Sequence, residues 1–260
     1  MNLPSGPVAA LAQREWVRFF RQPHRVVGSL AQPLLIWLLL GSGFAASFRA
    51  PGMEQISYLE YFYPGILLML ALFASIFSTI TIIEDRQQGL LQEVLVAPIP
   101  RSSLVLGKVI GAMVVALLQT IVLLLAAPLL GLVPSLLQLV MVLAGLILTA
   151  LGFTTLGFLI AWNMESSAGY HAIMSVFLMP LWMLSGALFP IDQAPGWLWW
   201  LMMVNPVSHA LTLIRLPFYH SDPLLLFQNG SYLIAWTVTL LWAGGCFLLA
   251  LWRVNRVEKS

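Results

Sequence analysis

The chain has 260 residues, of which 60% are hydrophobic and 8% charged, and its mean hydropathy is +0.91. A soluble globular domain carries about 25% charged residues, so this composition cannot cover a surface that faces water. The sequence therefore predicts an integral membrane protein, built from spans of about 20 apolar residues each. Its lone cysteine, Cys246, excludes an intramolecular disulfide and any cysteine-based zinc or redox motif.

The N-terminal segment predicts an amphipathic helix over 7–22. Apolar side chains, Trp16 and Phe19 among them, recur there at helical spacing, which places them in the headgroups of the inner membrane surface. The arginines of this region follow at i, i+4, i+7 and i+11 and are expected to face anionic lipid: Arg14, Arg18, Arg21 and Arg25. The alternative interpretation is a basic flank that only sets topology. No secretory signal peptide is expected, because a continuous apolar core with a small-residue cleavage site is missing.

Charge-free intervals predict six membrane-spanning helices. A lipid-facing backbone must satisfy its own hydrogen bonds, so each span is expected to be helical. The long interval Val109–Met164 is divided by the turn signal Gly131-Leu132-Val133-Pro134-Ser135. The expected spans are 26–48, 61–83, 107–130, 136–162, 168–189 and 230–252.

The interval 193–214 is also free of charge and is a candidate seventh span. With six spans, ten of the twelve lysines and arginines share one side with both termini, which indicates cytoplasmic termini. These ten are Arg14, Arg18, Arg21, Arg25, Arg86, Arg101, Lys108, Arg253, Arg256 and Lys259. A seventh span would move the last three outside. Because Asn205-Pro206 interrupts the interval and its tryptophans resemble an interfacial belt, we expect an outer re-entrant segment over 190–222.

A long patterned loop, 84–103, follows the second span. At 100° per residue, the leucines and valines of Leu90–Leu95 fall on one face, with Arg86, Gly89 and Glu93 near the other. Pro98 and Pro100 end the helix that this pattern predicts. Such a helix is suited to transmit force to a partner, and the alternative is an ordinary interfacial loop helix.

Missing motifs narrow the function further. Gly107-Lys108 is followed by Val109, so the chain has no phosphate-binding GxxxxGK[ST] loop and is not expected to hydrolyse nucleotide. No ionisable residue lies within the expected spans except near their ends, which disfavours a proton relay. No histidine or carboxylate cluster has the spacing of a metal or catalytic site. We expect no enzyme, no metal and no nucleic-acid partner.

The order of these elements resembles the permease subunit of ABC type-2 exporters, as a single transmembrane domain over 1–260. The stretch Glu84–Arg101, EDRQQGLLQEVLVAPIPR, is similar to the family's central signature. Pro180–Pro190, PLWMLSGALFP, resembles its "P…SG…FP" element. Pro195-Gly196-Trp197, then Asn205-Pro206 and Arg215, resemble its outer segment.

The resemblance implies an ATP-driven exporter of the bacterial inner membrane, with two permease copies and two ATP-binding subunits. ATP and magnesium would be bound by the partner subunits, and this chain would hold no cofactor. The coupling helix would dock on the partner through its apolar face and Glu93, with Gly89 allowing close backbone approach. The outer segment would plug the external end of a pathway lined by the first, second and fifth spans.

The resemblance also assigns residues to these roles. Contacts with the ATP-binding subunit are expected from Glu84, Asp85, Arg86, Gly89, Leu90, Leu91, Glu93, Val94, Leu95, Pro98 and Arg101. The outer gate is expected from Ser185, Gly186, Pro190, Pro195, Trp197, Asn205, Pro206 and Arg215. The interfacial helix contributes Arg14, Trp16, Arg18, Phe19 and Arg21.

The start Arg14–Pro23 is similar to the branch that exports drugs and lipophilic compounds, and it lacks the "RDLKxRYR"-like start of polysaccharide exporters. Export of lipid-linked glycan or lipo-oligosaccharide is the alternative cargo. Two hypotheses of another class stay open: a facilitator or secondary carrier that works without ATP, and a membrane anchor or assembly factor that transports nothing.

Overall fold

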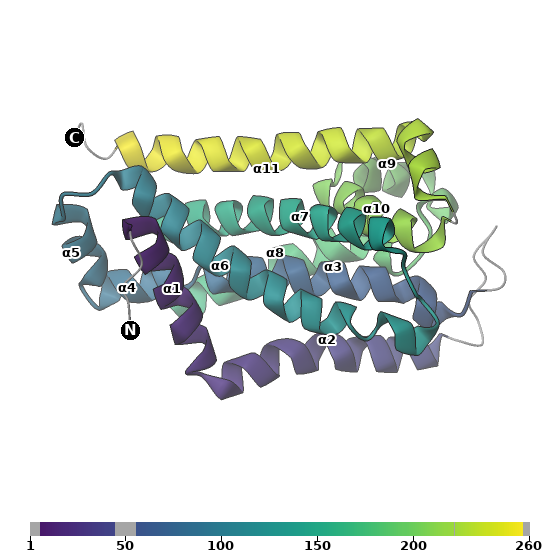
Figure 1. Cartoon of the computed structure of the whole chain (residues 1–260), viewed down its shortest axis with the longest axis horizontal. Helices are drawn as coiled ribbons and strands as arrows, with labels where there is room; N and C mark the ends of the chain where they lie inside the picture. Colours follow the sequence, from purple (N-terminus) through teal and green to yellow (C-terminus); the bar gives the residue numbers. More distant parts are fainter. Residues whose placement is uncertain (1–5, 45–55, 221, 257–260) are drawn as a thin grey trace.

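The computed structural model describes residues 6–44, 56–220 and 222–256, and these ranges hold helices and no strand (Figure 1). The α-helices are α1 Pro7–Phe20, α2 Pro23–Gly43, α3 Tyr58–Ser78, α4 Thr81–Gln87, α5 Leu90–Val96, α6 Arg101–Leu124, α7 Leu136–Trp162, α8 Ser167–Trp182, α9 Gly196–Val204, α10 Pro206–Tyr219 and α11 Gly230–Arg256. Shorter turns are the 3-10 helices η1 Ala127–Leu130, η3 Ile191–Gln193 and η4 Pro223–Gln228, and the π-helical turn η2 Met183–Ala187.

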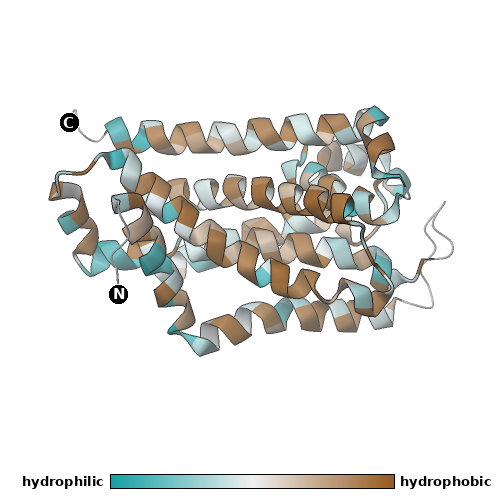
Figure 2. Ribbon diagram, in the orientation of Figure 1, coloured by the Kyte–Doolittle hydropathy of each residue, from teal (hydrophilic) through white to brown (hydrophobic). Residues whose placement is uncertain are grey.

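Six helical stretches are long and apolar enough to cross a membrane, which confirms the expected number of spans. They are Val26–Gly43, Tyr58–Gln87, Arg101–Leu130, Leu136–Trp162, Ser167–Ala187 and Gly230–Arg256. Hydrophobic residues fill their middle sections, and hydrophilic residues gather toward the two ends of the bundle (Figure 2). Residues 45–48 of the first expected span lie outside the described residues.

One end of the bundle carries α1, α4, α5 and the C-terminus, and the other carries α9, α10 and η4 (Figure 1). We call them the α5 end and the α9 end. α3 lies at the centre between α2, α6 and α7, and 83% of its most apolar window is buried. α2 and α8 are the opposite case, because only 17% and 22% of their windows are buried within the chain.

α1 packs across α6 at two glycines. A Cβ atom added at Gly107 would lie 2.6 Å from the Cβ of Leu11, and one added at Gly111 would lie 2.8 Å from the Cβ of Glu15. Any larger side chain at either position would therefore separate the two helices. This close crossing brings the polar face of α1 to the α5 end.

A turn of recognisable chemistry separates α6 from α7. Gly131, with φ +75°, closes η1, and Ser135 begins α7 by a reciprocal capping box with Gln138. The interval 193–214 forms two short helices, α9 and α10, which meet at Asn205. Neither is among the six candidate spans.

Candidate functional site: polar clusters at both ends of the bundle

Six charged side chains meet at the α5 end, and we call them the α1–α4 cluster. They are Arg14, Glu15 and Arg18 of α1, Glu84 and Asp85 of α4, and Lys108 of α6. The Asp85 side chain is 1% exposed and accepts hydrogen bonds from Arg14 at 2.8 and 2.9 Å and from Arg18 at 2.9 Å. Lys108, also buried, binds both Asp85 and Glu15. Three cations and three anions thus balance.

The cluster exists because α1 places Arg14 and Arg18 one turn apart, on the face that meets α4. Buried charges are tolerated when each is paired and hydrogen-bonded, and Lys108 completes the pairing from α6. The bond with Asp85 raises the pKa of the Arg14 guanidinium above its usual value. The expectation that these two arginines face lipid headgroups is wrong, because both bind carboxylates of α4.

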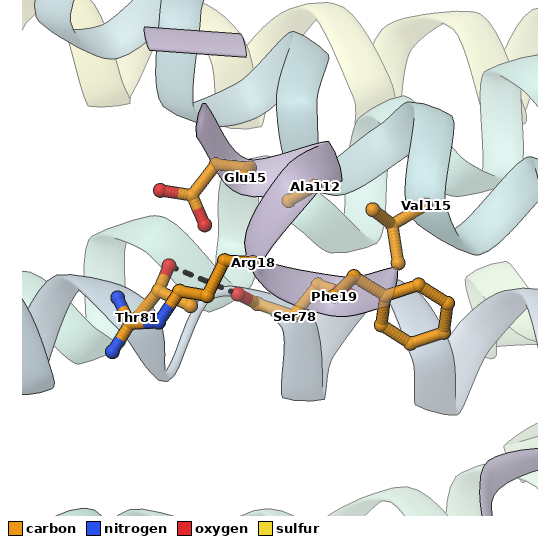
Figure 3. A pocket seen from close by; sticks show the side chains of 7 residues that line it. All are labelled: Glu15, Arg18, Phe19, Ser78, Thr81, Ala112 and Val115. Atoms are coloured by element: carbon orange, nitrogen blue, oxygen red, sulfur yellow. Dashed lines mark hydrogen bonds between the residues drawn. The ribbon is translucent and has the colours of Figure 1, made fainter. Parts of the chain in front are cut away.

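The apolar side of α1 is divided between the core and the exterior. Phe19 is buried and points between α3 and α6, toward Val115, so it does not lie in the headgroups as expected (Figure 3). Trp16 and Phe20 are 41% and 51% exposed and remain available to a membrane surface. Arg21 is exposed at the end of the helix.

The predicted loop helix is two helices. Gly89 separates α4 from α5 and has a φ of +80°, a conformation that favours glycine. A Cβ atom at Gly89 would meet nothing within 4 Å. Within the chain the left-handed turn accounts for this glycine, and the close approach expected of the partner's backbone stays a prediction.

α4 is fixed to the C-terminal end of α7. Arg86 donates to the carbonyl oxygens of Met164, at 2.9 Å, and Trp162, and its guanidinium lies 5.8 Å from the Trp162 ring centroid. A cation is favourable there because the last carbonyls of a helix carry partial negative charge. With Asp85 and Glu84 in the α1–α4 cluster, these three expected partner contacts all bind within the chain.

α5 presents a different face from the one expected. Leu91 is 4% exposed, and Leu91 and Val94 join the main core. Glu93 is exposed, Val96 is 85% exposed and Leu90 is partly exposed. The Leu95 side chain lies outside the described residues. Beyond the helix, Pro98 is exposed, and Arg101 donates to the carbonyl of Val254 at 3.4 Å.

At the α9 end, α8 breaks and leaves backbone carbonyls to be satisfied. The π-helical turn contains Gly186 with φ +86°, and we call the side chains around it the α8–α10 cluster. Arg215 of α10 donates to Gly186 O at 2.9 Å and to Ala187 O at 3.4 Å, and Tyr61 of α3 donates to Gly186 O at 3.1 Å. A buried carbonyl without a partner costs about 1–3 kcal/mol, so these donors stabilise the break.

The Asn205-Pro206 motif and the start of α10 also satisfy backbone carbonyls near the end of α8, about one turn before Gly186. Asn205 donates to Leu181 O at 2.7 Å and, as the N-cap of α10, accepts from the amide of Val207 at 3.0 Å. Ser208 donates to Leu184 O at 3.2 Å. Pro206 occupies the first turn of α10, where its missing N–H costs no hydrogen bond.

The other expected gate residues differ in their surroundings. Ser185 is buried and bonds to Trp182 O within its own helix. Pro190 and Pro195 precede η3 and α9, and Trp197 is 70% exposed. Two tyrosines of the cluster were missed by sequence reasoning: Tyr61, and Tyr58, which donates to Leu188 O at 3.2 Å. No motif singled them out in an aromatic-rich span.

Six apolar spans with polar clusters at both ends define a multi-pass membrane protein. Within the described residues, no group of three or more histidine, cysteine, aspartate or glutamate side chains could hold a metal ion. Residues 7–219 match the ABC-2 type transporter family, and the chain belongs to this family. It is the non-catalytic permease subunit of such a transporter, whose partner is an ATP-binding subunit.

Three relatives illustrate the range of the family. The chain is 32% identical over 215 residues to ycf38 of Cyanophora paradoxa, which carries the name of a transport permease, covering 82% of this chain and 74% of that protein. It is 28% identical over 204 residues to nodulation protein J of Rhizobium meliloti (strain 1021), covering 77% and 76%. YbhR of Escherichia coli (strain K12), which carries the name of a multidrug ABC transporter permease, is 25% identical over 62% of this chain and 44% of its own length.

Proposed function

We propose that this permease exports a drug-like or lipophilic compound across the bacterial inner membrane, as a homodimer driven by two copies of an ATP-binding subunit. The observation that carries the proposal is the apolar surface that α2 and α8 leave uncovered. Ile173, Val176 and Phe177 of α8 are 53%, 76% and 51% exposed. A second copy facing this surface would enclose an apolar pathway between the two chains.

A hollow on the same surface supports this cargo class. Val176, Phe177 and Leu184 face Leu201 and Val204 of α9 across a cavity of about 400 Å³. Its walls are mostly apolar, which suits a lipophilic compound better than a polar glycan. α3 is largely enclosed, so the expected contribution of the second span to the pathway is limited to partly exposed residues such as Phe73 and Phe77.

In this proposal the α5 end is cytoplasmic and the α9 end faces outward. The support is the gathering of lysines and arginines on the elements of the α5 end, Arg86, Arg253 and Arg256 among them, and the exposed Trp197 and Trp200 at the α9 end. α9 and α10 would then form the outer re-entrant segment. Both helices contact the π-helical turn at the end of α8, and this position would let them close the external end of the pathway.

The coupling route would begin at α5, with Glu93 and Val96 facing the ATP-binding subunit. A force applied to α5 passes through the Gly89 turn to α4. From there, the α1–α4 cluster connects it to α1 and α6. ATP and magnesium would be bound by the partner subunit, and this chain would contribute no nucleotide ligand.

The relatives' names differ in what they say of function, one naming nodulation and another multidrug transport. Lipid-linked glycan or lipo-oligosaccharide stays the alternative cargo. A facilitator that works without ATP is the alternative mechanism. Transport assays with and without ATP, using a lipophilic dye and a lipo-oligosaccharide, distinguish the proposed function from both alternatives.

The test begins with purification of the tagged permease in mild detergent, with mass spectrometry of what accompanies it. We expect a stoichiometric subunit with a phosphate-binding loop. The complex is then reconstituted in vesicles, and ATP-dependent movement of a lipophilic dye is measured against movement of a lipo-oligosaccharide. Movement of the dye without ATP would overturn the ATP-driven mechanism, and movement of the glycan alone would overturn the cargo.

A further inference from the structure

A small groove opens where the end of α1 meets α2, α3 and α6. Phe19 of α1, Ser29 and Gln32 of α2, Phe73 and Ser78 of α3, and Gln119 of α6 are among the side chains that line it. The α3 residues belong to the half of that helix nearer the α5 end. The groove lies within one chain and is separate from the cavity beside α8 and α9.

The buried amide of Gln119 lacks a partner on one side. Its Nε2 donates to the carbonyl of Val115 at 3.2 Å, while its Oε1 has no hydrogen-bond partner among the described residues. Gln119 is 4% exposed. A buried acceptor left unpaired costs about 1–3 kcal/mol, and more in an apolar medium, so this oxygen is a place where a bound donor would be stabilised.

A proline of α2 removes one backbone donor beside the groove. Pro33 lies inside the helix and has no N–H, so it cannot donate to the carbonyl of Ser29 one turn before it. Ser29 and Pro33 both line the groove. The Ser29 hydroxyl is used by the helix itself, since it donates to Val26 O at 2.9 Å. The acceptor that the groove offers to a ligand with a donor is therefore Gln119 Oε1.

Charge and size restrict the ligand further. None of the described residues that line the groove is charged, so an ammonium or phosphate group would lose its hydration without a counter-charge. The cavity volume is about 80 Å³. A cavity of about 150 Å³ holds one benzene ring, so the groove holds a head group of a few heavy atoms, with any alkyl chain lying outside along α2.

We infer that this groove binds neutral amphipathic molecules through a hydroxyl or amide N–H group, which donates to Gln119 Oε1. The inference deepens the proposed export of lipophilic compounds by naming the class of head group, and for that biological meaning it rests on the proposed function. The same head-group chemistry is found in a cargo molecule and in a neutral membrane lipid. The aromatic walls from Phe19 and Phe73 contact the first carbons of the chain.

The test uses a photoreactive twelve-carbon alcohol with a diazirine near the hydroxyl, and the methyl ether of the same molecule. The permease complex is placed in phosphatidylcholine vesicles without ATP, and labelled peptides of α2 and α3 are measured by mass spectrometry. We expect about tenfold more labelling by the alcohol, because the ether lacks the donor. Equal labelling by both in the wild type would overturn the inference without any variant.

Two variants of α6 test whether Gln119 accepts the hydrogen bond from the alcohol. Gln119→Leu should lower labelling by the alcohol to the level of the ether. Thr120→Val is the matched control, because the neighbouring Thr120 is also buried on α6 but bonds to Ala116 O and does not line the groove. Unchanged labelling in Gln119→Leu, or stronger labelling by the corresponding alkylamine, would each overturn the inference.

Two further measurements distinguish cargo from membrane lipid as the ligand, and distinguish this inference from the proposed export function. Competition by added diacylglycerol would assign the groove to membrane lipid and overturn its interpretation as a cargo site, while no competition supports cargo. Since labelling is measured without ATP, it is independent of export. Gln119-dependent labelling with no dye movement would contradict the proposed function alone, and dye movement with no such labelling would contradict this inference alone.

Discussion

The guanidinium carbon of Arg215 lies 4.2 Å from the centroid of the Tyr61 ring, although the two residues are 154 positions apart. The same guanidinium donates to the Tyr61 hydroxyl at 3.1 Å and to the carbonyl of Gly186 at 2.9 Å. One side chain of α10 thus joins the central helix α3 to the broken end of α8. In the proposed transport cycle, opening at the α9 end would break these contacts together.

Replacing Arg215 with Lys should weaken this connection while keeping the charge. A lysine has no planar fork, so it cannot lie on the ring and bond to two carbonyls at once. We expect a loss of about 1–3 kcal/mol in stability, seen as a lower midpoint in thermal unfolding of the detergent-purified protein. Tyr61→Phe should have a smaller effect in the same direction. An unchanged midpoint in both variants would contradict the role of the cluster.

Replacing Lys108 with Met should damage the α1–α4 cluster more severely. The change leaves the buried carboxylates Glu15 and Asp85 without their shared cation, and removing one partner of a buried ion pair costs about 3–5 kcal/mol. The expected result is a large loss of folded protein in fluorescence-detected size-exclusion chromatography. Adding Glu15→Leu to this variant should restore part of the loss, because Glu15 has lost its Lys108 partner, whereas Asp85 keeps Arg14 and Arg18.

The spans and their turns could be predicted because their physics is local. Charge-free length defines each span, and Gly131 followed by Ser135 marks one turn by backbone conformation and capping. The central position of α3 could not be predicted in this way. Every span is apolar on all sides, so composition does not tell a helix that faces lipid from one that faces other helices.

The sequence was enough to identify many residues of the candidate sites, but not to predict which side chains they contact. Glu84, Asp85 and Arg86 were found, but the resemblance assigned them to contacts with a partner protein, whereas the structure pairs them with α1, α6 and α7. Periodicity cannot show that Arg14 meets Asp85, since 71 residues separate them. Phe19 was misplaced for a related reason, because the close crossing at Gly107 and Gly111 turns it into the core.

That crossing gives a third prediction. A Cβ atom at Gly111 would lie 2.8 Å from Glu15 Cβ and 3.1 Å from the Cα of Ala12, so a valine there forces α1 away from α6. We expect Gly111→Val to release α1 and make it accessible to limited proteolysis on the side of the α5 end. Gly244→Val is a suitable control, because a Cβ atom at Gly244 in α11 would meet nothing within 4 Å. Equal protease resistance in both would contradict tight packing of α1.

The proposed orientation gives a fourth prediction. With six spans and cytoplasmic termini, a tag placed after Ser260 should be protected from protease in sealed right-side-out vesicles and cleaved after permeabilisation. A second tag inserted after Gln193, in the outer segment, should behave in the opposite way. Cleavage of the C-terminal tag in sealed vesicles would make the 193–214 interval a true span.

The face of α5 gives the last prediction, and it tests the coupling route directly. Glu93 is exposed on α5, so Glu93→Arg should leave the fold intact and place a repelling charge in the contact with the ATP-binding subunit. Losing a charge pair in a protein interface costs about 2 kcal/mol or more, so we expect substrate-stimulated ATP hydrolysis to fall by at least about tenfold. Glu165→Arg is the matched control, because it makes the same charge change at an exposed residue in the turn between α7 and α8.

Leu91→Asp should behave differently again: Leu91 is 4% exposed, so this variant should lose folded protein rather than coupling. If Glu93→Arg retained full stimulation, or Glu165→Arg lost as much, the partner's contact would have to lie elsewhere at the α5 end.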